Sequence, residues 1–89
     1  MPKFLVVHSV GKGLTLEQAT PIAKAAKAGS TTDAYWIRSW YARDEGKLYC
    51  EWDGKDGATI QKLLKGATPD MPVDGVYKLE MMVNGEDFR

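Results

Sequence analysis

One stretch decides the fold, residues 33–53, which read DAYWIRSWYARDEGKLYCEWD. From Asp33 to Tyr41, and again from Lys47 to Asp53, large side chains recur at every second position, as they do in β-strands. The turn between the two runs ends in Gly46, where a positive φ costs little. The stretch therefore predicts a β-hairpin.

The alternation also predicts which hairpin residues share a face. With an unbroken period of two, Trp36, Arg38 and Trp40 point the same way from the first strand. On the second strand, Tyr49 and Glu51 share one face, and Leu48, Cys50 and Trp52 share the other. Because Arg38 and Glu51 fall on matching faces of neighbouring strands, we expect them to form an ion pair.

The flanking sequence supplies two helices and two more strands. Thr15-Leu-Glu-Gln18 matches a capping box and Gly29 is a typical stop, so a helix is expected from Leu16 to Ala28. Asp56 is a good cap for a second helix that ends at Gly66. Apolar residues predict a further strand at 3–9 and another at 73–83, followed by a polar tail at 84–89.

The predicted order of elements is β-α-β-β-α-β. This is the split βαβ pattern of the ferredoxin-like sandwich, an α+β fold. Right-handed crossovers place the 3–9 and 47–53 strands in the middle of a four-stranded antiparallel sheet, with both helices on one face. Residues 1–89 are few enough that we expect a single domain.

Two helices cover only one face of such a sheet, and we expect the other face to be apolar. The residues expected there are Phe4, Val6, His8, Trp36, Trp40 and Tyr49. Aromatic groups in this number favour burial against a partner, so we expect a homodimer formed through the sheet face. The alternative is that the tryptophans lie beneath the helices as ordinary core.

The residues that could carry chemistry gather around the only histidine. His8 lies on a strand expected to pair with the second hairpin strand, which would bring Tyr49 and Glu51 beside it on one face. His8 and Glu51 are the candidate metal ligands, and with Trp36, Trp40 and Tyr49 they form the candidate ligand-binding set. The alternative role for His8 is structural, with its ring hydrogen-bonded to a carbonyl or hydroxyl group.

Composition limits the classes of binding partner and the cellular compartment that we expect for this protein. Twelve basic and twelve acidic residues give a net charge of zero, which removes the electrostatic argument for nucleic acid or an acidic membrane. No apolar run reaches the roughly 20 residues that span a bilayer. The single cysteine, Cys50, is expected to be a buried hydrophobic residue, and a chain without disulfides is expected in the cytoplasm.

Three segments resemble a family of small bacterial domains of largely unassigned function. They are Lys3–His8, the hairpin with Trp40 before residues 44–51, and Pro72–Lys78. Named members of that family are nickel-binding, ferredoxin-like homodimers, so the resemblance implies a divalent transition metal such as nickel, with His8 as a ligand. Because the chain has no second histidine, further ligands would come from Glu51, Tyr49 or a second subunit.

Three functions stay open, one of which is an oligomeric scaffold that binds no small ligand; the other two involve a bound molecule. The first is a cytoplasmic homodimeric domain that binds a small ligand or a metal ion. The second rests on a similarity of sheet architecture to the dimeric α+β barrels, which include cofactor-independent monooxygenases. This second function is that of a monooxygenase- or isomerase-like enzyme acting on a small apolar molecule. In it, His8 would be the base, and Trp36, Trp40 and Tyr49 would line a pocket. The residues favour the first function and by themselves point to no cofactor.

Overall fold

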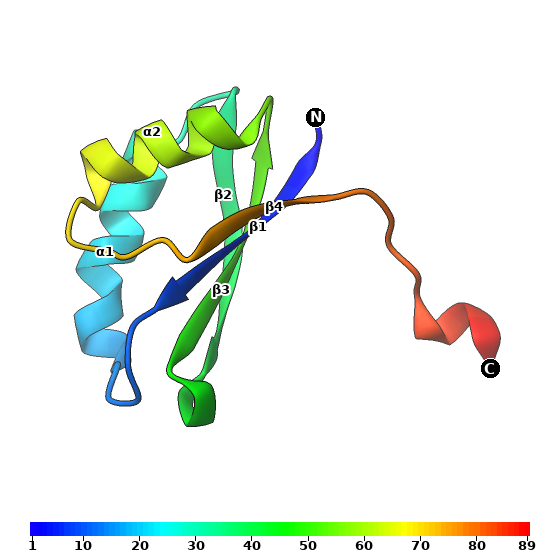
Figure 1. The fold of residues 1–89 in the computed structure, drawn as a ribbon, viewed down its shortest axis with the longest axis horizontal. Helices are drawn as coiled ribbons and strands as arrows, with labels where there is room; N and C mark the ends of the chain where they lie inside the picture. Colours follow the sequence, from blue (N-terminus) through cyan, green and yellow to red (C-terminus); the bar gives the residue numbers. More distant parts are fainter.

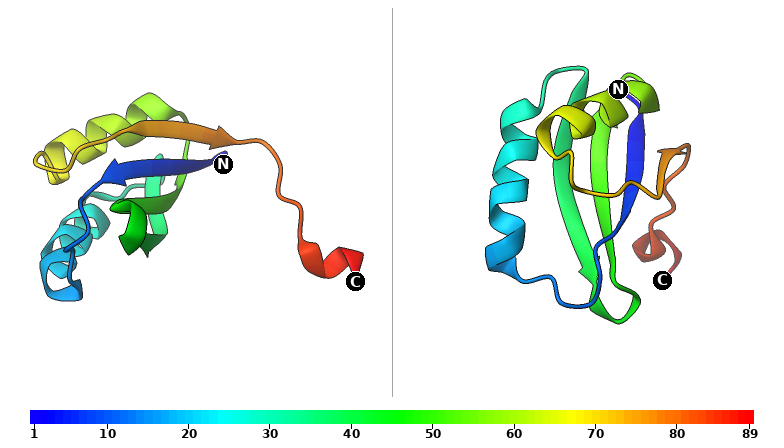
Figure 2. Two further views of the ribbon diagram at one scale, coloured as in Figure 1. Left: turned by 60° about the horizontal axis from the view of Figure 1, so that its bottom comes forward. Right: turned by 60° about the vertical axis from the view of Figure 1, so that its left-hand side comes forward.

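A four-stranded antiparallel sheet carries two helices on one of its faces. The computed structural model describes residues 1–89. Its elements are β1 (Lys3–Ser9), α1 (Leu16–Gly29), β2 (Ala34–Ala42), β3 (Lys47–Gly54), α2 (Gly57–Ala67) and β4 (Gly75–Leu79), with 3₁₀ turns at Arg43–Glu45 and Gly85–Phe88. The strands lie in the order β2-β3-β1-β4 (Figure 2, right), and both helices lie on the same side of them (Figure 1). The predicted α+β ferredoxin-like fold is confirmed.

Local sequence sets the starts of both helices. The hydroxyl of Thr15 accepts from the backbone N–H of Gln18, and the Gln18 side chain accepts from the N–H of Thr15, so the predicted capping box is present. Asp56 caps α2 by accepting from the N–H of Thr59 at 2.8 Å. Both helices end one residue later than the sequence predicts. Neither α1 nor α2 has the length and hydrophobicity that a membrane-spanning helix requires.

A β-bulge between Trp36 and Arg38 changes the faces of β2. Trp36 pairs with Trp52 on β3, but the next pair joins Arg38 to Glu51, so β2 holds one residue more than β3 between these pairs. Trp36 therefore packs against the core beneath the helices, whereas Trp40 lies on the uncovered face and is 53% exposed. The prediction that Trp36 and Trp40 share a face is wrong, because the bulge interrupts the alternation.

The core lies between the sheet and the two helices. Its buried hydrophobic residues are Phe4, Val6, Ala26, Ala34, Cys50, Trp52, Ile60 and Leu64. The prediction that Phe4, Val6 and His8 lie on the uncovered face is wrong. The register of β1 sets Phe4 opposite Trp52 and Val6 opposite Cys50, and directly opposed residues point to the same side of a sheet.

β4 is shorter than the strand predicted at 73–83. Its last residue, Leu79, pairs with Lys3 where β1 begins, and Pro2 has no N–H with which to extend the ladder. Met81 and Met82, inside the predicted strand, are 81% and 86% exposed. Residues 80–89 project away from the sheet (Figures 1 and 2).

Candidate functional site

A cavity of about 400 Å³ lies between α1 and the sheet. Its floor is the helix-covered face of β2 and β3, and residues of α2 and of the loop after it close one end. Thirteen of its 17 lining residues are hydrophobic. The lining consists of Leu14, Thr15, Leu16, Ala19, Ile22, Ala23, Ala26, Trp36, Ser39, Tyr41, Arg43, Leu48, Cys50, Trp52, Leu64, Thr68 and Met71.

The small side chains of α1 account for the space. Ala19, Ala23 and Ala26 follow one another at helical spacing and all line the cavity. Protein interiors are normally filled to the density of organic crystals, with few voids larger than a water molecule. Because an alanine methyl group is too short to fill the space above the floor, this face of α1 leaves the cavity open.

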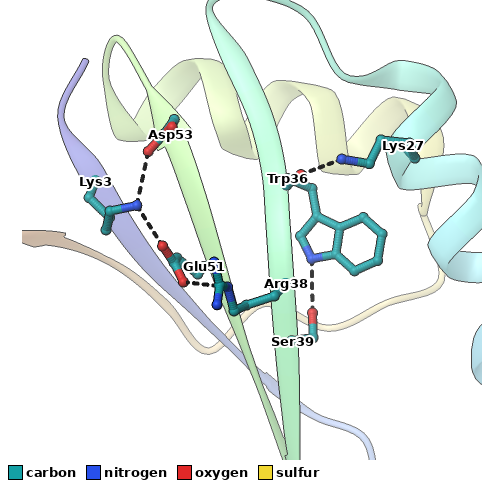
Figure 3. Close-up of polar contacts among 7 residues, drawn as sticks. All are labelled: Lys3, Lys27, Trp36, Arg38, Ser39, Glu51 and Asp53. Carbon is teal, nitrogen blue, oxygen red and sulfur yellow. Dashed lines mark hydrogen bonds and ion pairs between the residues drawn. The ribbon is translucent and has the colours of Figure 1, made fainter.

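The polar groups of the cavity floor are bonded to one another. The indole N–H of Trp36 donates to Ser39 Oγ at 2.9 Å (Figure 3), and the Ser39 hydroxyl donates to Cys50 Sγ at 2.9 Å. Burial raises the pKa of the Cys50 thiol to about 11, because desolvation disfavours the thiolate. Cys50 is therefore a neutral buried thiol, as the sequence predicts, and not an activated nucleophile.

Trp52 carries a buried N–H group without a hydrogen-bond partner. The residue lines the cavity and is 1% exposed, yet its Nε1 meets no acceptor in the protein. A buried donor left unbonded costs about 1–3 kcal/mol. Because this Nε1 atom is closed to solvent, the unbonded N–H is a cost of packing and not a donor open to a molecule in the cavity.

Arg43 forms one end of the cavity, where the hairpin meets the loop before α1. Its guanidinium donates to the carbonyl oxygens of Lys12 at 3.0 Å and Leu14 at 3.4 Å, and lies 5.2 Å from the centre of the Tyr41 ring. The Tyr41 hydroxyl donates to Gly11 O at 2.6 Å and accepts from the N–H of Leu14. These contacts fix the position of Arg43 at the exposed mouth.

His8 lies outside this cavity and holds the loop that precedes β4. The residue is 1% exposed, and its Nδ1–H donates to Pro72 O at 2.7 Å. Burial lowers the pKa of His8, while the bond to Pro72 and the charge of Asp74 act in the opposite sense. His8 is thus a neutral ring bonded to the backbone, which fits the structural role set out above.

Glu51 lies on the uncovered face in a chain of ion pairs. It contacts Lys3 Nζ and lies 3.1 Å from Arg38 Nε, while Lys3 also lies 3.2 Å from Asp53 Oδ1 (Figure 3). The predicted pair of Arg38 and Glu51 is confirmed. The charges along the middle of this face are therefore matched within the chain.

The five predicted site residues fall into two groups. Trp36 and His8 face the helices, and of these two only Trp36 lines the cavity. Trp40, Tyr49 and Glu51 lie on the uncovered face, where Trp40 pairs with Tyr49. The expectation that His8, Tyr49 and Glu51 converge on one face is wrong. Tyr49 pairs with Val7, the neighbour of His8 on β1, and successive residues of a strand point to opposite sides of the sheet.

Comparison with known proteins agrees with the resemblance seen in the sequence. Residues 4–79 match the model of a family described as nickel responsive protein, SCO4226-like. The chain belongs to this family. The crystal structure of SCO4226 from Streptomyces coelicolor A3(2) matches 91% of this SCO4226-like chain and 99% of its own, with a TM-score of 0.80 and 20% sequence identity, which supports the fold alone. No curated protein matches the chain.

The residues of this SCO4226-like chain do not fit a nickel site. Protein sites for transition metals usually take three or more N, O or S ligands. No group of three or more His, Cys, Asp or Glu side chains could hold an ion. His8 and Glu51, the predicted ligand pair, lie on opposite faces of the sheet, so they cannot bind one ion within the same chain.

Sequence reasoning missed most residues that shape the cavity. Arg43 occupies a turn, and its sequence context gives no sign that it meets the loop before α1. The alanines at positions 19, 23 and 26 did carry a signal, since three short side chains on one helix face leave space at a sheet. Placing Trp36 and Ser39 on the floor required the bulge, which the sequence pattern does not reveal.

Proposed function

We propose that this SCO4226-like protein is a binding domain that holds one small, mainly apolar molecule between α1 and the sheet. The observation that carries the proposal is the cavity of about 400 Å³ with 13 hydrophobic residues among 17. Ligand pockets are typically about 300–1,000 Å³, mostly apolar, with a few placed polar groups. A free, buried cysteine suits a reducing compartment, so we place the protein in the cytoplasm.

An enzymatic role is not proposed. The alternative function required a general base beside the bound molecule, and His8 was the candidate. Because His8 does not line the cavity and its Nδ1–H is bonded to Pro72, it is not placed to take a proton from a molecule held there. The remaining polar groups of the floor, Ser39 and Cys50, lack an adjacent base.

The test of ligand binding is fluorescence titration with N-phenyl-1-naphthylamine, an uncharged probe that brightens in apolar surroundings. The unmodified protein should bind it at one molecule per chain. Ala23→Phe should abolish binding, because the ring fills the cavity, whereas Ala28→Phe, on an exposed turn of the same helix, should leave binding unchanged. Equal binding by both variants would show that the probe occupies another surface.

We further propose that the uncovered sheet face binds a second copy of the chain. Trp40 and Tyr77 are 53% and 55% exposed there, so their burial in a dimer is favourable. The ion pairs of Lys3, Arg38 and Glu51 are already matched, so contact with a copy leaves no isolated charge at the centre.

Light scattering tests this second proposal. At tens of micromolar, the solution mass should be that of a dimer, twice 9.9 kDa. Trp40→Lys should convert the dimer to a monomer, because it places a charge in the interface. The matched control, Lys62→Glu on the helix side, should remain dimeric. A monomeric parent protein would overturn the proposal without affecting the cavity.

A further inference from the structure

Most polar side chains of the cavity are already engaged in hydrogen bonds. The Trp36 indole, the Ser39 hydroxyl and the Thr68 hydroxyl already donate to Ser39 Oγ, Cys50 Sγ and Leu64 O. The Tyr41 hydroxyl is used both as donor and as acceptor. The donors that remain are the Thr15 hydroxyl, which so far only accepts from the N–H of Gln18, and the spare N–H groups of Arg43.

Arg43 is the only charged residue among the 17 that line the cavity. Its contacts to Lys12 O and Leu14 O engage two of the five N–H groups of a guanidinium. No carboxylate of the chain forms an ion pair with it, although Asp44 and Glu45 follow it directly in sequence. Arg43 is therefore a fixed cation at one end of an apolar cavity, with donors to spare for an anion.

The cavity extends from this cation along the strands of its floor. Leu48, which pairs with Tyr41, lines it near Arg43, and Trp52 lines it four residues farther along β3. Four residues of strand span about 13 Å. The floor thus suits an elongated molecule whose polar end lies at Arg43 and whose apolar body lies over Leu48 and Cys50 toward Trp52.

We propose that the molecule bound in this cavity is a small carboxylate with an apolar body, whose anionic end is held by Arg43. This inference rests on the proposed ligand-binding function. A cation is disfavoured because the lining offers no carboxylate and one positive charge. A guanidinium matches a carboxylate with two parallel N–H···O bonds, which an uncharged end group cannot form with equal strength.

The experiment compares 1-naphthylacetate with its uncharged amide, 1-naphthaleneacetamide, as competitors of N-phenyl-1-naphthylamine. The two compounds share the same ring system and differ only at the end group. The unmodified protein should bind the carboxylate about tenfold more tightly than the amide, as expected for a charge-assisted bond. The preference should fall as salt concentration rises, since the mouth is exposed to solvent.

Variants of Arg43 identify the residue responsible. Arg43→Gln should reduce the preference to about one, because the carboxylate loses more affinity than the amide does, and Arg43→Lys should keep part of the preference. Arg38→Gln, which removes a cation from the uncovered face, should leave the preference intact. Circular dichroism checks that each variant is folded.

The outcomes separate this inference from the function on which it rests. The inference is wrong if the naphthylamine probe binds but the carboxylate and the amide compete equally. It is also wrong if the preference for the carboxylate survives in folded Arg43→Gln. In both cases the proposed binding of an apolar molecule is unaffected. Failure of both compounds to displace a bound probe counts against the inference in the same way. If the probe itself does not bind, the proposed function fails first.

Discussion

The two faces of the sheet are built from the same four strands but are stabilised in different ways. On β1, Val6 is fully buried beneath the helices, whereas its neighbour Val7 lies half-buried on the uncovered face. The covered face holds the core and the cavity, and the uncovered face holds the ion pairs around Glu51 beside exposed aromatic rings. The covered face is therefore stabilised mainly by hydrophobic burial within the chain, whereas the uncovered face combines ion pairs with aromatic rings that remain exposed.

The sharpest test of this difference is the same substitution on neighbouring residues. Val6→Ala should lower the free energy of unfolding by about 2 kcal/mol, since it removes buried methyl groups and leaves a void. Val7→Ala should cost less than about 1 kcal/mol in dilute protein. Urea denaturation measures both. The cost of Val7→Ala should grow with protein concentration if dimers form, and equal costs in dilute protein would contradict the contrast.

A smaller effect is expected from the ion pairs of the uncovered face. Glu51→Gln should destabilise the fold by about 1 kcal/mol, because Lys3 and Arg38 lose a shared carboxylate that is only 15% exposed. The loss should shrink in high salt. Glu86→Gln makes the same change in an exposed pair of the projecting segment and should have no measurable effect. A loss independent of salt would argue against an electrostatic origin.

On the covered face, His8 should make stability depend on pH. Burial lowers the pKa of His8 in the folded protein, so the unfolded chain binds a proton at higher pH than the folded chain does. Stability should therefore fall as the pH drops below about 6.5, the ordinary pKa of histidine. His8→Gln retains a donor for Pro72 and should show a flatter profile between pH 7 and 5.

Two carboxyl groups have a lowered pKa and titrate below the pH range of that measurement. Hydrogen bonds from Lys47 and Ser9 hold the pKa of Asp74 below its usual value, and bonds from Thr59 do the same for Asp56. Protonation of these two carboxylates therefore lowers the stability of the fold only at pH values near and below 3.8. Thermal unfolding of the two proteins at pH 7, 6 and 5 gives the comparison, and parallel profiles would exclude His8 as the cause.

The smallest expected effect concerns nickel. Because neither face gathers three ligands, calorimetric titration of the protein with nickel chloride should give the same weak heat before and after His8→Gln. Loss of a strong binding step in the variant would show that His8 ligates nickel, with further ligands from a second subunit. The family's description as nickel responsive makes this the relevant metal to test.

The sequence alone determined the elements of this protein, because the signals for them are local. The capping box at Thr15, the cap at Asp56 and the glycine turn at Gly46 depend on residues a few positions apart, so their prediction succeeded within one residue. The order of elements then restricts the sheet to the arrangement of the ferredoxin-like fold.

Only the tertiary structure decided which side of the sheet each residue faces. A strand of period two is compatible with either side, and the choice depends on register against β3 and on a one-residue bulge in β2. That choice placed Trp36 and His8 beneath the helices, left Trp40 and Glu51 uncovered, and brought Arg43 to the end of the cavity. The site could not be predicted from the sequence because it depends on contacts between distant segments, which no local pattern records.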